Sequence, residues 1–186
     1  MKNRSIFAFL SIVLAFTACE DNVYPKPKAM LRLEYSRPAG KIFETEQLTF
    51  EYNEIAKIKV KNSTALTIDY PEMKASIFIN YRSVEDNLEK LMVDAQRLSV
   101  EHAKKADDIK NKVYENEEQK VYGVFYEVIG NAASQAQFFV TDRNAHFVTG
   151  SLYFETKPNY DSIYPASAYL QNDMGRIMET LRWKKK

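Results

Sequence analysis

The stretch from Lys120 to Phe154 constrains the fold of this chain most, because it contains three consecutive strand patterns. Between residues 121 and 129, apolar side chains occupy both alternating sets of positions. A strand with one face in water would carry polar residues on that face, so we expect this strand to be covered on both sides. Turn residues at Gly130-Asn131 and Asp142-Arg143-Asn144 separate the patterns. The three strands are predicted at 121–129, 135–141 and 146–155.

Two amphipathic patterns predict helices that pack against this sheet. Residues 84–105 repeat apolar side chains at helical spacing behind Ser83, a favourable N-terminal cap. Residues 162–182 carry a second apolar stripe that Asp161 or Ser162 can cap, with Pro165 in the first turn and basic residues after the end. Because the central strand needs cover on both faces, the two helices are expected on opposite faces of the sheet.

Shorter alternating patterns complete the predicted sheet. The run 109–114 is expected to form an edge strand, and the polar run Glu115–Gln119 after it a solvated loop. Further strands are predicted at 30–35, 48–52, 55–60, 66–70 and 75–81. The predicted fold class is therefore α+β, an antiparallel β-sheet sandwiched between two helices.

The first eighteen residues have the composition of an export signal. Two basic residues precede an apolar run of eleven residues, Ile6–Phe16, which is shorter than the about 20 residues that span a bilayer. Ala18 then precedes Cys19, the single cysteine of the chain, in a pattern typical of a bacterial lipobox. We therefore predict a lipoprotein signal peptide at 1–18 and acylation of Cys19. An ordinary signal peptide with a chance cysteine is the alternative.

A short spacer follows Cys19. The prolines of Tyr24-Pro25-Lys26-Pro27-Lys28 favour an extended polyproline II conformation, which would hold the next domain close to the lipid anchor. Glu20-Asp21 is either a cue for surface export or an ordinary solvated pair of acids. The predicted organisation is a signal peptide at 1–18, a lipidated extended tether at 19–28 and a single globular α+β domain at 29–186.

Charge and cysteine content argue against several classes of protein. Removal of residues 1–18 lowers the number of basic residues from 26 to 24, against 25 acidic residues. A near-neutral exported domain is a poor candidate for binding nucleic acid. With Cys19 acylated, no thiol remains to form a disulfide or to act as a nucleophile.

Candidate catalytic residues are few. His102 and His146 are the only two histidines, and no group of further metal ligands surrounds either one in the sequence. There is no Gly-rich phosphate loop and no nucleophile elbow. His102 is interpreted as a hydrogen-bonded residue at a helix end, with a metal ligand or proton carrier as the alternative. The sequence thus predicts no enzyme, no metal and no cofactor, and leaves His102 and His146 as the candidate positions for a site.

Short motifs in a fixed order run through nearly the whole chain. They are Pro25-Lys26-Pro27, Leu31-Arg32-Leu33, Tyr70-Pro71, Met73-Lys74-Ala75, His102, Lys105-Ala106-Asp107, Lys120-Val121-Tyr122-Gly123, Gly130-Asn131-Ala132-Ala133, His146-Phe147-Val148-Thr149-Gly150, Lys157-Pro158-Asn159, and Met178-Glu179-Thr180-Leu181 with Trp183. In order and spacing they resemble the gliding-motility lipoprotein GldD family of Bacteroidetes. More distantly, the order of elements resembles the Mog1/PsbP-like α-β-α sandwich, an analogy of fold alone.

The family resemblance implies a cell-envelope lipoprotein required for gliding motility and for the associated type IX secretion machinery. It implies anchoring at the outer membrane through Cys19, and partners among other envelope proteins and lipoproteins of that machinery, without enzymatic activity or cofactor. An assembly or scaffold role is expected. The alternative is a periplasmic ligand-binding module or a hydrolase with a pocket near His102 or His146. Relatives often carry a cysteine pair near residues 48–65, where this chain has none, and packing is expected to replace that disulfide.

Overall fold

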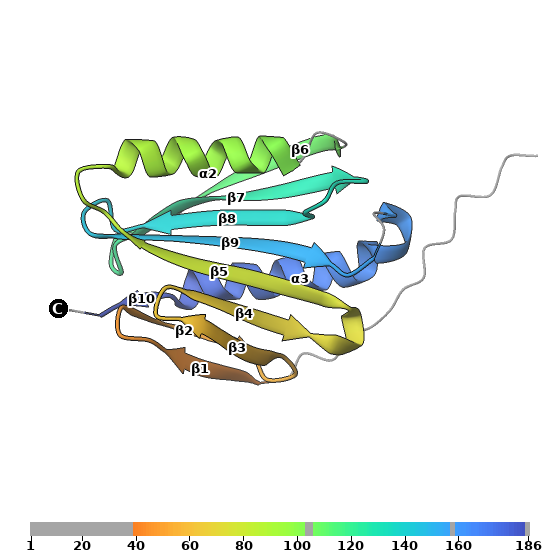
Figure 1. The fold of residues 1–186 in the computed structure, drawn as a ribbon, viewed down its shortest axis with the longest axis horizontal. Coiled ribbons are helices and arrows are strands. Elements are labelled where there is room, and N and C mark those ends of the chain that lie inside the picture. The colour runs from red at the N-terminus through yellow and green to blue at the C-terminus, as the bar shows by residue number, and fades with distance from the viewer. Residues whose placement is uncertain (1–38, 103–105, 157–158, 185–186) are drawn as a thin grey trace, which may run out of the picture. The chain divides into compact units, whose positions relative to one another are not determined.

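The computed structural model describes residues 39–102, 106–156 and 159–184 (Figure 1). The predicted signal peptide, the tether and the predicted strand at 30–35 lie outside these residues. The elements follow in the order β1 (Gly40–Glu44), β2 (Leu48–Asn53), β3 (Lys57–Asn62), β4 (Ala65–Tyr70), η1 (Pro71–Met73), β5 (Ala75–Ser83), α2 (Leu88–His102), β6 (Ala106–Asn116), β7 (Val121–Gly130), β8 (Ala136–Thr141), β9 (His146–Phe154), α3 (Tyr160–Thr180) and β10 (Arg182–Trp183).

Seven strands form one antiparallel sheet in the order β3-β4-β5-β9-β8-β7-β6, and Figure 1 shows its central strands side by side. The prediction that residues 120–154 form adjacent antiparallel strands is confirmed by the pairing of β7 with β8 and of β8 with β9. Val121 and Val128 project to opposite faces of β7, and both are fully buried. The apolar character of both faces of this strand therefore reflects cover on both sides, as expected.

Helix α3 covers what we call the inner face of the seven-stranded sheet, the face that carries Ile77, Val140 and Leu152. These residues form one core with Leu170 and Met174 of α3. The helix buries eight side chains, which are Ile163, Ala166, Ser167, Leu170, Asp173, Met174, Ile177 and Met178. The pattern follows the spacing of three and four residues that places side chains on one face of a helix.

A second, three-stranded sheet in the order β1-β2-β10 shares this core through Leu48 and Phe50 of β2. The sequence predicted that the last helix continues to residue 182, and this was wrong, because α3 ends at Thr180. The Thr180 hydroxyl donates to the Arg176 carbonyl at 2.7 Å and accepts the Glu51 N–H at 2.9 Å. Residues 182–183 can then pair with β2 instead of extending the helix.

The outer face of the seven-stranded sheet is the opposite face, and α2 packs against it. Leu91 of α2 forms a small cluster with Phe139 and Phe147. The predicted placement of the two helices on opposite faces is therefore confirmed, as is the α+β class. The predicted start of this helix after Ser83 was wrong. Ser83 ends β5, where it pairs with His146, because continued pairing with β9 delays the helix until Leu88.

Several strand boundaries also differ from the prediction. β6 begins at Ala106 and continues through Asn116, because Glu115 and Asn116 pair with β7 instead of forming a solvated loop. β3 is shifted toward the C-terminus relative to the predicted strand at 55–60, since residues 53–56 form a turn closed by a hydrogen bond from the Ala56 N–H to the Asn53 carbonyl. Of the helices described, none is both long enough and apolar enough to cross a bilayer.

Candidate functional site

Two loops and the ends of three strands meet at one end of the seven-stranded sheet. His146 begins β9 directly after the loop 142–145, and it pairs with Ser83 at the end of β5. Trp183 of β10 reaches the same place and donates its indole N–H to the carbonyl of Lys120, at the end of the loop before β7. We call Tyr81, Lys120, Asp142, His146 and Trp183 the His146 cluster.

The imidazole of His146 is held on two sides. Its Nδ1 lies 2.9 Å from the Tyr81 hydroxyl, and its ring stacks on the Trp183 indole with centroids 5.1 Å apart and planes inclined by 9°. Only 7% of the residue is exposed. A ring that is hydrogen-bonded at Nδ1 and covered by an indole ties β9 to β5 and β10. This geometry suits a structural histidine better than a freely accessible proton carrier.

Asp142 organises the loop that precedes His146. One carboxylate oxygen accepts the backbone N–H groups of Asn144, Ala145 and His146 at 3.0, 2.8 and 2.8 Å. Burial acts to raise the pKa of Asp142, but the three N–H donors favour the ionised form and hold the pKa below its ordinary value. One oxygen of the carboxylate, Oδ1, is therefore engaged in shaping the loop.

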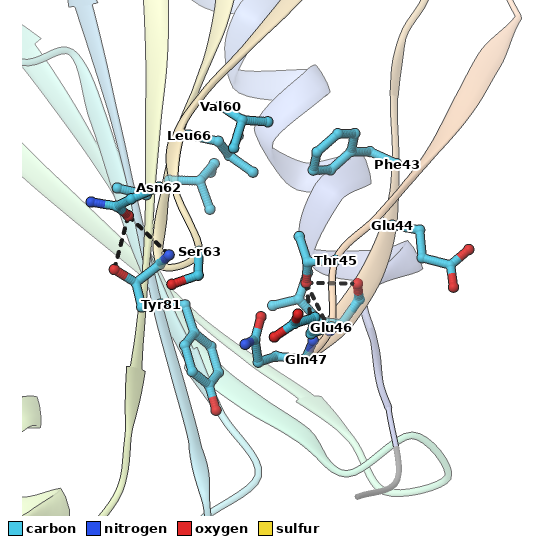
Figure 2. Close-up of a pocket in the computed structure, with 14 residues that line it drawn as sticks. Phe43, Glu44, Thr45, Glu46, Gln47, Val60, Asn62, Ser63, Leu66 and Tyr81 are labelled. Carbon is cyan, nitrogen blue, oxygen red and sulfur yellow. Dashed lines mark hydrogen bonds between the residues drawn. The ribbon is translucent and has the colours of Figure 1, made fainter.

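A narrow groove opens beside the His146 cluster, between the hairpin of β1 and β2 and the hairpin of β3 and β4. Figure 2 shows Phe43 facing Val60 and Leu66 across it, with Thr45 on the rim. We call it the hairpin groove. Its lining residues are Phe43, Glu44, Thr45, Glu46, Gln47, Leu48, Val60, Asn62, Ser63, Thr64, Ala65, Leu66, Ile79 and Tyr81.

The size of the hairpin groove limits what it can hold. Its volume is about 230 Å³, below the roughly 300–1,000 Å³ typical of small-molecule sites. Its walls are mostly apolar, so it suits one or two apolar side chains of a partner better than a polar substrate. Tyr81 lines the groove and also binds His146, which joins the two features into one surface.

A buried polar network lies elsewhere, between α3 and the two sheets. The Asn53 amide donates to the Tyr169 hydroxyl at 2.7 Å and to Asp173 Oδ2 at 2.8 Å, and the Tyr70 hydroxyl donates to the same oxygen at 3.1 Å. Burial raises the pKa of Asp173 although both hydrogen bonds act in the opposite direction. Burial, followed by the neighbouring Asp173, also raises the pKa of Tyr70. The network is closed and joins elements, which is a structural role.

The structure describes some of the site residues predicted from the sequence and not others. Cys19 lies outside the described residues, as does the side chain of His102, whose backbone ends α2. Their predicted roles stay predictions. Among residues 39–102, 106–156 and 159–184, no group of three or more His, Cys, Asp and Glu side chains could hold a metal ion.

Sequence reasoning missed Tyr81, Asp142 and Asp173 as partners in these clusters. Asp173 carried a signal, because it lies three residues after Leu170 and one before Met174, on the apolar stripe of the last helix. Asp142 stood in a turn motif, although its three backbone partners could not be assigned. Tyr81 had no signal in the sequence, since its partner His146 is 65 residues away.

The comparison with known families agrees with the observed domain. Residues 20–183 match the model of the family described as gliding motility lipoprotein GldD. The chain belongs to this family. The match begins directly after Cys19 and ends at Trp183, so it includes every described helix and strand. No curated protein matches the chain.

Membership in the GldD family makes the chain a lipoprotein of gliding motility, which implies attachment to the cell envelope through lipid. The family is a motility component and is not known as an enzyme family. Three of the motifs that carried the resemblance meet in the His146 cluster, those that begin at Lys120 and His146 and the one that ends at Trp183. The cluster is thus the place where distant motifs of the chain converge.

Proposed function

We propose that the chain is a non-enzymatic assembly component of the gliding apparatus and of its associated type IX secretion machinery. Lipidated Cys19 holds it at the outer membrane, and the folded domain binds other envelope proteins of that machinery. The proposal rests on the family match for the process and on the surface of the domain for the mode of action.

One observation carries the proposed mode of action. Among the described residues, the three most exposed large apolar side chains are Ile42, Val113 and Val60, at 73%, 67% and 62% exposure. Each lies on a strand at the edge of a sheet, namely β1, β6 and β3. Proteins usually guard edge strands with charges, bulges or covering segments, because an open edge attracts another chain. β3 and β6 also carry lysines and one bulge each. An exposed apolar side chain on three of the four edge strands nevertheless favours binding to partner proteins.

The polar groups near the hairpin groove support the same conclusion. The Tyr81 hydroxyl is bound to His146, and Asp142 holds three backbone N–H groups. A hollow of about 490 Å³ opens at His146, and Glu118, Lys120 and Lys184 line it beside Asp142. The two titratable side chains at its centre, His146 and Asp142, are engaged in the hydrogen bonds named above. Because they already stabilise the fold, the alternative function has less support than an assembly role.

A substitution at Val60 tests the proposed mode of action. Val60 lies both on an edge strand and in the hairpin groove, and its exposure means that Val60→Glu should leave the core intact. We expect cells that carry Val60→Glu to lose gliding and secretion of type IX cargo. The readouts are single-cell gliding speed and the amount of cargo in the medium.

The matched control is Val93→Glu, which places the same charge on a valine that is 56% exposed but lies on a helix, α2, instead of an edge strand. This variant should glide and secrete as the wild type does. Both variants must reach the wild-type amount in the envelope and melt at the wild-type temperature. Normal gliding by a folded Val60→Glu variant would contradict the proposed role of this surface.

A further inference from the structure

Strand β6 presents a long open edge. It pairs with β7 along its length, and no strand of the described residues pairs with its other side. In an antiparallel pair, every second residue directs its backbone N–H and C=O groups away from the partner. An edge of eleven residues therefore offers roughly five such residues to a further strand.

The two faces of β6 differ in chemistry. Ile109 and Val113 project to the outer side, where they are 37% and 67% exposed. Lys110 and Lys112 project to the inner side, toward an open hollow of about 470 Å³ between β6, β7 and α3. A strand added beside β6 would place alternate side chains against these two environments.

The inner side of β6 carries Asp108 as well as Lys110 and Lys112, and the position of Lys112 favours an acidic residue on an added strand. The hollow is lined by three basic side chains, those of Lys110, Lys112 and Arg176, and by two carboxylates, those of Glu127 and Glu179. Lys110 faces Glu127 across the strand pair, whereas Lys112 faces Phe125 and has no acid opposite it. An acidic side chain on an added strand would supply that missing cross-strand partner.

A second copy of the chain fits this edge poorly. In an antiparallel pair of two β6 strands centred on Asn111, Lys110 of one copy would face Lys112 of the other. Centring on Lys110 or on Lys112 would set identical lysines opposite each other. Like charges directly opposite on neighbouring strands are destabilising. The registers that pair most of β6 are therefore disfavoured for self-association.

We propose that β6 is a β-strand addition site for an extended segment of a partner protein in which apolar and acidic residues alternate. The backbone edge provides affinity, Ile109 and Val113 receive the apolar side chains, and Lys112 selects the acidic ones. The inference rests on the proposed assembly role in one respect. That role identifies the partner as another envelope protein of the machinery.

The test uses the full-length chain in detergent micelles and two blocked nine-residue peptides, one alternating valine with glutamate and the other alternating valine with lysine. The wild type should bind the glutamate peptide. Lys112→Glu should weaken that binding at least tenfold and should bind the lysine peptide instead. The matched control is Lys61→Glu, which reverses an exposed lysine on β3, the opposite edge strand, and should bind as the wild type does.

Hydrogen exchange locates the bound peptide. Addition of the glutamate peptide should slow exchange of amides within 106–116 and leave those within 57–62 unchanged. The inference is overturned if the wild type does not bind, if Lys112→Glu binds normally, or if protection falls on another strand. A concentration-dependent dimer that protects β6 would overturn it as well, because the occupant would be a second copy. None of these results concerns motility, so each leaves the assembly role to its own test.

Discussion

The two helices have similar sequence patterns and yet are held very differently. α3 buries eight side chains and lies in a core shared by the inner face of the seven-stranded sheet and the three-stranded sheet. On α2, Leu91 is the buried residue among those whose side chains the structure describes, and Met92 and Val93 are 40% and 56% exposed. The inner face, under α3, therefore contributes more buried side chains to stability than the outer face, which α2 covers lightly.

The two faces therefore differ in how much they contribute to stability. The core around α3 can support an exported domain that has no disulfide among its described residues. The outer face contributes less apolar burial, so substitutions there should cost little stability. Changes at three positions of α3 test this division, beginning with the largest expected effect.

The largest expected effect is a difference in lost stability between the two helices when one leucine side chain is removed from each. Leu170 of α3 is fully buried and Leu91 of α2 is 6% exposed. A buried Leu→Ala change costs about 2–5 kcal/mol, depending on how far the surroundings can close the cavity. We expect Leu170→Ala near the upper limit and Leu91→Ala near the lower, measured by urea unfolding. Equal losses would show that α2 is held as firmly as α3.

Asp173, which is buried on α3, should make the free energy of unfolding depend on pH. Burial raises the folded-state pKa of Asp173 above its ordinary value of 3.8. The folded protein therefore binds more protons than the unfolded chain between these two pKa values, and stability falls as pH rises through that window. The contribution of the protonated acid is complete below the unfolded-state pKa and is lost once the pH exceeds the folded-state pKa.

Asp173→Asn isolates this effect, because Asn53 and Tyr70 donate to the same carboxylate oxygen and an amide oxygen can accept both bonds. The variant and the wild type should be equally stable below pH 3.8. The variant should gain relative stability as pH rises and reach a plateau above the folded-state pKa of Asp173. Urea unfolding over a pH series measures the difference. A difference that does not change with pH would exclude the proposed ionisation.

The smallest expected effect strengthens α3 alone. A Cβ added at Gly175 would meet no atom within 4 Å. Alanine inside a helix is more stable than glycine by about 0.5–1 kcal/mol, so Gly175→Ala should raise the free energy of unfolding by that amount. Gly123→Ala is the contrast, because its Cβ would lie 1.9 Å from the Phe139 carbonyl oxygen. A loss of stability in Gly175→Ala would indicate a contact that the structure does not show.

The sequence predicted the centre of the fold well, for a physical reason. The strand at 121–129 carries apolar residues on both faces, and this pattern requires two covering layers whatever the remaining topology is. The turns at Gly130-Asn131 and at 142–144 then placed the neighbouring strands. These signals are local, so they can be read without knowledge of distant contacts.

The errors lie where distant partners decide the outcome. Residues 182–183 read as the end of a helix, but pairing with β2, more than 130 positions earlier, makes them a strand. Ser83 read as a cap, but β9 extends β5 through it. The His146 cluster and the hairpin groove depend on Tyr81, which meets His146 only through this sheet topology. The two helical stripes likewise gave no sign that α3 would be covered by a second sheet.

The most direct test of the proposed role is the fate of Cys19→Ser in cells. Lipid contributes about 0.8 kcal/mol per buried methylene, so loss of the acyl chains should release the chain from membranes. If the domain acts by binding partners at the outer membrane, the variant should stay folded, lose labelled palmitate, leave the outer-membrane fraction and fail to support gliding. Full gliding by a soluble, unlabelled and folded Cys19→Ser protein would contradict the proposed role, because a function that survives without the anchor does not depend on placement at the membrane.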